Sequence, residues 1–378
     1  MKSCIIPLVI ILMTTCFPQN SLAVSISAQY ACVMNAQTGQ VIFEKNAYEK
    51  HSMASTTKIM TALLALENAG KNELVTVSAN AAGTEGSSIY LKAGEIIPMD
   101  DLLYGLMLES GNDAAIAVAE HVGGSVDYFA KMMTARAMEI GAKNTQFKNP
   151  NGLDEEGHYT TAYDLALITR TALLNPRFAE IVSTKRKSIP ATENGVARSF
   201  SNHNKLLSLY TGCTGVKTGF TKKTGRCLVS AAEREHVSLI CVTLNAPNDW
   251  SDHKTLLDHA FANESARPLV IKDMVLKTLP VKNGNHATLD LLAAEDFFLS
   301  VSGGEGLGKV RLTYQLPSSI TAPITIGTKI GQVQITYDGK PLKEIDLLAG
   351  TDIFYIEPPS PTTMDNFKKF FETILNFN

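Results

Sequence analysis

The sequence predicts an α/β (α+β) protein with two folded domains: a first domain with a mixed sheet and a helical subdomain, then a small all-β domain. Strand-like segments at 27–43 and 215–244 enclose a helical middle, which predicts one sheet built from both ends of the first domain. Beyond residue 270, apolar and polar residues alternate as in half-buried strands. A length of 378 residues also exceeds one ordinary compact core.

The first 23 residues have the features of a secretory signal peptide. Lys2 precedes an apolar run over 4–13, and Ser21-Leu22-Ala23 supplies a small-residue cleavage site. The run is shorter than the roughly 20 apolar residues that a membrane anchor needs. A lipoprotein signal ending at Cys16 is a weaker alternative, because the residue before it is large. We therefore expect an exported, extracytoplasmic protein, in the periplasm or on the outer face of the cytoplasmic membrane.

The composition excludes some classes of partner. The formal net charge of −3 gives no electrostatic reason to bind nucleic acid. No Cys-x-x-Cys or His-rich pair has the spacing of zinc ligands, so we expect no metal and no cofactor. Export permits disulfides without requiring them, and four cysteines follow the signal: Cys32, Cys213, Cys227 and Cys241.

The first domain is predicted over residues 24–265 and opens with a hairpin at 27–43. Ser55-Thr56-Thr57 precede an alanine-rich apolar stretch that ends at Gly70. This pattern predicts a buried helix with an N-terminal hydroxyl cap and a glycine stop. Further helices are expected at 99–107, 114–122, 126–140 and 161–174, before strands return over 215–244.

A β-sandwich domain is predicted over residues 270–357, followed by a proline-rich linker at 357–361. Residues 362–378 predict an amphipathic helix with apolar residues on one face and charged residues on the opposite face. The apolar face carries Met364, Phe367, Phe370, Phe371, Ile374 and Leu375. The aromatic load favours a helix that lies in a membrane interface. The alternative is a terminal helix packed on its own protein.

Three short motifs carry candidate chemistry, and each occurs twice. Ser-x-x-Lys is present at Ser55 to Lys58 and at Ser251 to Lys254. Nucleophilic acyl transfer needs a hydroxyl and a base that removes its proton. At the start of a buried helix, residues i and i+3 share one side, so the Lys58 amine can reach the Ser55 oxygen. Burial also lowers the pKa of a lysine. Ser251 lies at a polar, solvated helix start, and we interpret it as structural.

Ser-x-Asn is present at Ser78 to Asn80 and at Ser110 to Asn112. The second pair lies between two apolar helical segments, which predicts a tight turn that projects both side chains into a cleft. Ser78 belongs to a polar stretch after a short β-like run. We therefore take the pair Ser110 and Asn112 as the functional one.

Lys-Thr-Gly is present at Lys217-Thr218-Gly219 and again at Lys223-Thr224-Gly225. The first copy continues a strand, where glycine lets a substrate peptide approach the backbone and add as another strand. The second copy occupies the turn before the next strand. We choose Lys217 and interpret Lys223 as a turn residue.

In this order and context, the three motifs resemble those of the serine penicillin-recognising enzymes. More narrowly, the chain resembles the low-molecular-weight D-alanyl-D-alanine carboxypeptidases over nearly its whole mature length, including MASTTKIMTALLAL, LESGNDAA, NPNGLD, TTAYDLALI, GVKTGFT and APNDW. The resemblance implies a β-lactamase/transpeptidase-like first domain. It also implies a peptidase that removes the terminal D-alanine from peptidoglycan stem pentapeptides and binds β-lactam antibiotics covalently.

The resemblance implies a role for each motif residue. Ser55 forms the acyl-enzyme, and Lys58 takes its proton. Ser110 relays a proton toward the departing D-alanine, Asn112 holds the substrate amide, and Lys217 supplies positive potential.

The remaining site residues are implied to bind substrate. Thr218 binds the terminal carboxylate, Gly219 allows the close approach, and the backbone N–H groups of Ser55 and Phe220 form the oxyanion hole. His203, in NHNKLL, stands where relatives carry arginine. A titrating imidazole there weakens carboxylate binding or makes it pH-dependent.

Two other functions stay open at this point. A serine β-lactamase uses the same motifs, but in class A a glutamate activates the hydrolytic water. The loop with Asp154, Glu155 and Glu156 lacks the Glu-x-x-Leu-Asn pattern. A non-catalytic wall-binding protein that keeps the fold has no need of an activated nucleophile. The sequence does not decide whether water or an amine accepts the acyl group.

Overall fold

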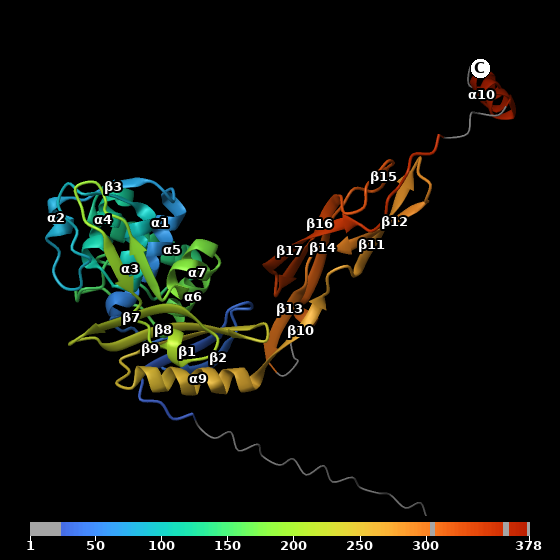
Figure 1. Cartoon of the computed structure of the whole chain (residues 1–378). Coiled ribbons are helices and arrows are strands. Elements are labelled where there is room, and N and C mark those ends of the chain that lie inside the picture. The colour runs from blue at the N-terminus through green and yellow to red at the C-terminus, as the bar shows by residue number, and fades with distance from the viewer. Residues whose placement is uncertain (1–23, 303–306, 358–362, 376–378) are drawn as a thin grey trace, which may run out of the picture.

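The computed structural model describes residues 24–302, 307–357 and 363–375, so the expected signal peptide lies outside the described residues. A five-stranded sheet in the order β2-β1-β9-β8-β7 forms the centre of the first domain (Figure 1). Its strands are β1 Tyr30–Asn35, β2 Val41–Lys45, β7 Cys213–Thr221, β8 Gly225–Arg234 and β9 Val237–Leu244. Both ends of the domain contribute strands, as predicted, and β7 lies at one edge.

The pairing within this sheet differs from the expected mixed arrangement. Every pair is antiparallel, because β1–β2 and β7–β8–β9 are successive hairpins and β9 runs antiparallel to β1. Sequence patterns identify strands but not their relative direction, which depends on the connections. A mixed sheet occurs in the second domain, where β11 pairs with β15 in parallel.

Helices cover both faces of the five-stranded sheet. Leu256 and Leu257 of α9 pack with Ala31 and Val33 of β1 on one face. The alternate residues of β1 belong to the larger core on the other face, which the remaining long helices supply. The first-domain helices are α1 Lys58–Asn68, α2 Ala79–Ala82, α3 Met99–Leu108, α4 Asn112–Gly123, α5 Val126–Ile140, α6 Ala162–Leu173, α7 Pro176–Ser183, α8 Leu206–Leu209 and α9 Asp249–Asn263. Two small hairpins complete the domain, β3 Leu74–Thr76 with β4 Ile96–Pro98 and β5 Arg186–Ile189 with β6 Arg198–Ser201.

The start of α1 corrects one expectation. A 3₁₀ turn over Ala54–Thr57 precedes the helix, and no side chain caps its N-terminus. The Thr57 hydroxyl instead donates to the Ala54 carbonyl, 2.8 Å away, and the Thr56 hydroxyl donates to the Met53 carbonyl. The helix also ends at Asn68 with Ala69 in extended backbone, so no left-handed glycine stops it. The expected burial of α1 is confirmed.

The second domain is all-β and begins at Glu264, where α9 ends (Figure 1). One sheet has the order β14-β16-β17-β12-β11-β15, and β10 and β13 form a separate pair. The strands are β10 Glu264–Val270, β11 Val275–Lys282, β12 Thr288–Ala293, β13 Phe297–Ser302, β14 Val310–Gln315, β15 Ile320–Thr321, β16 Lys329–Tyr337 and β17 Lys340–Ala349.

Hydrogen bonds join the two domains. The Asn35 amide donates to Glu264 Oε2 at 2.8 Å and to Ser300 Oγ at 3.0 Å, and all three residues are buried. A last helix, α10, covers Thr363–Leu375. In the part of the chain that the structure describes, no helix is both long and apolar enough to cross a membrane.

Candidate active site

Ser55 and Lys58 lie together where the 3₁₀ turn meets α1. The Lys58 Nζ is 3.1 Å from the Ser55 Oγ. Lys58 is fully buried, and this burial, together with the nearby Lys217, lowers its pKa well below that of an ordinary lysine, against an opposing effect of Asp113. A neutral amine at this distance can accept the proton of the serine hydroxyl.

Two asparagines hold the Lys58 amine in place. It donates to Asn112 Oδ1 at 2.7 Å and to the Asn151 carbonyl at 2.6 Å. The other end of the Asn112 side chain donates from Nδ2 to the Glu85 carbonyl at 2.7 Å. Both polar atoms of Asn112 therefore have protein partners, and the residue orients the base.

Ser110 occupies the tight turn between α3 and α4 that the sequence predicts. Its backbone is left-handed, with φ of 64°, and the residue is 6% exposed. This conformation is uncommon for a residue with a side chain. Ser110 lines the same cavity as Ser55.

Lys217, Thr218 and Gly219 follow one another on the edge strand β7. Lys217 is buried and donates to the Thr218 carbonyl at 3.0 Å, and burial lowers its pKa to about 7. A Cβ atom at Gly219 would lie 3.0 Å from the Ser55 nitrogen, so glycine lets β7 pass close beside the nucleophile turn.

A cavity of about 350 Å³ brings most of the predicted residues together. Six of the nine line it: Ser55, Ser110, His203, Thr218, Gly219 and Phe220. The other three, Lys58, Asn112 and Lys217, are buried. Residues that the sequence analysis did not select complete the lining: Ser87, Lys205, Arg226, Asp249 and Trp250.

His203 lies at the rim of this cavity, with its side chain 51% exposed. Its Nε2 is 3.2 Å from Glu109 Oε2, and its backbone N–H donates to the Leu108 carbonyl. The imidazole is therefore beside a carboxylate that competes with a substrate carboxylate for it.

The second copy of each motif lies elsewhere. Ser251 is exposed within α9. Ser78 caps α2 by accepting from the Ala81 N–H at 2.9 Å. Lys223 is exposed in the turn between β7 and β8, where its neighbour Thr224 donates to Asp154. None of these residues lines the cavity of Ser55, so we retain their interpretation as structural.

The four cysteines of the described chain are free thiols: Cys32, Cys213, Cys227 and Cys241. Within the described ranges, no three His, Cys, Asp or Glu side chains form a group suited to a metal ion.

Comparison with known proteins identifies the family of this chain. The sequence profile of the D-alanyl-D-alanine carboxypeptidases matches residues 17–248. This chain belongs to that family. A second profile, for the C-terminal domain of penicillin-binding protein 5, matches residues 265–354. The chain is therefore a low-molecular-weight penicillin-binding protein and a serine peptidase, and the predicted fold class is confirmed.

Individual relatives cover both domains. The D-alanyl-D-alanine carboxypeptidase DacF of Bacillus subtilis is 34% identical over 335 residues, which are 86% of each chain. DacA of Escherichia coli is 31% identical over 87% of this chain and 84% of its own. The structure of penicillin-binding protein 5 from Haemophilus influenzae aligns with a TM-score of 0.62 at 28% identity, covering 87% of this chain and 98% of that one.

Another structural relative is named for a different activity. The crystal structure of the Streptomyces K15 DD-transpeptidase aligns with a TM-score of 0.60 at 33% identity. The match covers 63% of this chain and 98% of that one.

Arg226 is a cavity residue of this carboxypeptidase that sequence reasoning missed. It lies on β8 opposite Phe220 in the sheet register. Its Nε is 3.0 Å from Asp249 Oδ2, and its guanidinium lies 6.0 Å from the centre of the Trp250 ring. No local pattern marks this residue, because it reaches the cavity only through the pairing of β7 with β8.

The support of the nucleophile turn was also missed. Gly152 has φ of 88°, and a Cβ there would lie 1.9 Å from the Ala54 carbonyl oxygen. The His158 ring accepts from the Lys148 N–H at Nδ1, so Nε2 carries the proton and donates to Thr57 Oγ1 at 2.8 Å. The Thr57 hydroxyl then donates to Ala54, next to Ser55.

Proposed function

We propose that this protein is a D-Ala-D-Ala carboxypeptidase that acts through an acyl-enzyme on Ser55. The observation that carries the proposal is the buried Lys58 amine 3.1 Å from the Ser55 hydroxyl. A buried cation that forms no ion pair is costly, and although the charge of Asp113 opposes it, burial favours the neutral, basic form of Lys58. The family supplies the substrate class, a peptide ending in D-Ala-D-Ala.

In the first step, Ser55 Oγ forms a bond to the carbonyl carbon of the penultimate D-alanine. Lys58 takes the hydroxyl proton, and the bond from that carbon to the nitrogen of the terminal D-alanine breaks. Ser110, at the cavity wall, relays a proton to the departing nitrogen. In the second step, the oxygen of water forms a bond to the acyl carbon, the bond from that carbon to Ser55 Oγ breaks, one water proton returns to Ser55 Oγ, and the shortened peptide leaves with a new carboxylate.

The substrate is proposed to bind as an added strand along β7. This strand lies at the edge of the sheet, and edge strands present free hydrogen-bonding groups. The N–H groups of Ser55 and Phe220 stabilise the oxyanion. Asn112 is proposed to hold the substrate amide through its Oδ1 atom, which then accepts from both the substrate and Lys58.

The terminal carboxylate of the substrate is proposed to bind Thr218, with Arg226 and Lys217 supplying positive charge. Arg226 is permanently charged, and its Nε bond to Asp249 fixes the guanidinium beside the cavity. Lys217 is charged only in part at neutral pH, because its pKa is about 7.

Peptide hydrolysis tests this proposal. A pentapeptide ending in D-Ala-D-Ala is incubated with the protein and the products are weighed by mass spectrometry. We expect the loss of one alanine, its abolition by Ser55→Ala, and its retention by Ser251→Ala, which removes the serine of the second Ser-x-x-Lys. Loss of activity in Ser251→Ala with activity retained in Ser55→Ala contradicts the proposal.

The same experiment tests transpeptidation, which the similarity to the Streptomyces K15 enzyme supports as a second candidate. If an amine accepts the acyl group, a cross-linked dimer of the peptide appears in place of the shortened monomer. Both products require the acyl-enzyme on Ser55.

Penicillin is proposed to acylate Ser55 and to leave slowly. A β-lactamase needs a base that activates water, but Asp154 accepts from Thr221 and Thr224. The Glu155 carboxylate accepts from Asn149. None of the three carboxylates at 154–156 lines the cavity. A non-catalytic wall-binding role gives no reason for the Ser55–Lys58 contact.

Export by residues 1–23 and binding of α10 to the membrane surface complete the proposal. Phe367, Phe370 and Phe371 of α10 are each more than half exposed, and apolar side chains of such a helix gain by entering a lipid interface. The measurement is sedimentation with anionic lipid vesicles. Phe370→Ser with Phe371→Ser should leave the protein in the supernatant, and equal sedimentation of both forms contradicts this role.

A further inference from the structure

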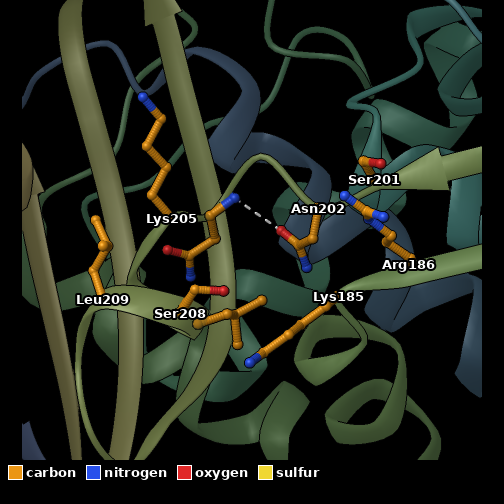
Figure 2. Close-up of a pocket in the computed structure, with 9 residues that line it drawn as sticks. Lys185, Arg186, Ser201, Asn202, Lys205, Ser208 and Leu209 are labelled. Carbon is orange, nitrogen blue, oxygen red and sulfur yellow. Dashed lines mark hydrogen bonds between the residues drawn. The ribbon is translucent and has the colours of Figure 1, made fainter.

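A second pocket adjoins the catalytic cavity. It measures about 620 Å³ and lies between the β5–β6 hairpin and α8. We call it the basic pocket and define it by Lys185, Arg186, Ser201, Asn204, Lys205 and Ser208. In Figure 2 the Lys205 side chain lies to the left of Asn202 with its amine pointing upward, Arg186 lies to the right of Asn202, and Lys185 runs below it. Lys205 also lines the catalytic cavity, so the two spaces meet at this residue.

The charges of the basic pocket are unbalanced. Lys185, Arg186 and Lys205 contribute three cations, and none of them forms an ion pair with a described residue. Among the residues that the structure describes, no aspartate or glutamate lines this pocket. Three cations around one concave surface favour an anionic ligand.

A buried donor adds an independent observation. Asn204 is 3% exposed, and its Oδ1 accepts from the Leu206 N–H at 3.1 Å, which fixes the orientation of the amide. Its Nδ2 is the one buried side-chain nitrogen or oxygen of the described chain that has no hydrogen-bond partner. An unsatisfied buried donor is destabilising. Asn204 is also one of the lining residues, so this donor lies beside the pocket.

We propose that the basic pocket binds a carboxylate of the peptide substrate, outside the D-Ala-D-Ala end that is cleaved. The ligand is thus an acidic peptide that occupies both spaces at once. Their junction at Lys205 supports one continuous occupant, and α8 packs beside β7, the strand proposed to pair with the peptide. Lys185 and Arg186 bind the carboxylate, and Asn204 donates to it. This inference rests on the proposed function.

A pair of substrates tests the pocket. Both are pentapeptides ending in D-Ala-D-Ala, one with glutamate at its second position and one with glutamine there. For the unmodified protein, we expect a KM about 10-fold lower for the glutamate peptide, which corresponds to about 1.4 kcal/mol. In the double variant Lys185→Met with Arg186→Met the two KM values become equal, while kcat and the rate of penicillin acylation stay unchanged.

The control is the double variant Lys92→Met with Lys143→Met, which removes two exposed cations outside both cavities. It should keep the preference for the glutamate peptide. Equal KM values for the two peptides in the unmodified protein overturn the proposed role of the basic pocket. A loss of preference in the control as large as that in the Lys185→Met, Arg186→Met variant overturns it too. Release of no alanine from either peptide overturns the proposed carboxypeptidase function instead.

Discussion

At the scale of single residues, two buried lysines have different roles in the proposed reaction. Lys58 touches the Ser55 hydroxyl and is held by Asn112 and Asn151. Lys217 has its own acceptor in the Thr218 carbonyl. Burial lowers the pKa of both amines, and for Lys58 the neighbouring Lys217 lowers it further. The first is suited to accept a proton, and the second to carry a charge that depends on pH.

The pH dependence of kcat/KM should show the Lys217 charge. The free enzyme loses this charge as the pH rises through about 7, the pKa of Lys217. Because a positive group attracts the substrate carboxylate, kcat/KM for the free acid should fall above this pH. A substrate whose terminal carboxylate is amidated is the control, and its profile should lack the fall. Identical profiles for the two substrates contradict a role for Lys217 in binding the carboxylate.

Replacement of Arg226 tests the other cation. Arg226→Gln removes the charge but keeps a side chain that can bond to Asp249. We expect KM for a D-Ala-D-Ala peptide to rise by about 10-fold or more, since a hydrogen bond to a charged group contributes about 1.5–3 kcal/mol. Arg226→Lys should restore part of the affinity. Steady-state kinetics measure both, and an unchanged KM in Arg226→Gln shows that the arginine does not contact substrate.

Much of the site could be predicted from sequence because its parts are local motifs. Ser55 and Lys58 are one helical turn apart, so their spacing places the two side chains together, and Ser110 and Asn112 lie in a turn that the two flanking apolar segments mark. Arg226 and the Asn151 carbonyl carry no such signal. The first reaches the cavity through strand register, and the second acts through a backbone atom that any residue possesses.

At the scale of elements, the nucleophile turn depends on its neighbours rather than on a helix cap. Ala54 has φ of 48°, and its carbonyl accepts from Thr57, which His158 holds in turn. The loop at Gly152 packs directly against this carbonyl. Serine and threonine at a helix start usually predict a cap. Here the hydroxyls bond to the preceding carbonyls, which sequence alone does not distinguish.

Gly152→Ala should disturb this turn, and Gly141→Ala is its matched control. Both glycines have left-handed backbone, with φ of 88° and 98°. A Cβ at Gly141 meets nothing within 4 Å, whereas at Gly152 it meets the Ala54 oxygen at 1.9 Å. Backbone strain should cost each variant about 1 kcal/mol of unfolding free energy, and the clash with Ala54 should destabilise Gly152→Ala further. Only Gly152→Ala should also slow penicillin acylation, by about 10-fold or more, in a stopped-flow assay.

Equal acylation rates in the two glycine variants contradict the proposed support of the turn.

The long helices α3 to α6 could be predicted without knowledge of their tertiary contacts, because their apolar periodicity and their Gly, Asn and Pro boundaries lie in the sequence itself. Strand direction in the central sheet depends on contacts between distant segments, so the expected mixed sheet was wrong.

At the scale of the whole molecule, buried neutral imidazoles join the layers of the first domain. His253 of α9 bonds to Ser230 of β8 at 2.6 Å and to Thr243 of β9 at 2.9 Å. Burial lowers the pKa of His253 to about 3 and that of His158 to about 4, from 6.5. The fold therefore binds these rings in their neutral form.

Acid should weaken the first domain between about pH 6.5 and pH 4. Below 6.5 the unfolded chain takes up protons on both rings while the folded chain does not, so the free energy of unfolding falls with falling pH. Each ring should account for about 2 kcal/mol between about pH 7.5 and pH 5. Urea unfolding followed by the fluorescence of Trp250, the one tryptophan, measures this. His253→Gln should reduce the pH dependence by one ring's share, and an unchanged dependence contradicts the assignment.

The two domains and α10 are proposed to place the protein on the wall side of a membrane. Its proposed activity depends on one atom, the Ser55 Oγ. The most direct measurement is the intact mass of the protein after brief incubation with penicillin. Ring opening expels no fragment, so we predict a gain of one whole penicillin, absent in Ser55→Ala and retained in Ser251→Ala. A gain in mass that persists in Ser55→Ala contradicts the assignment of the nucleophile.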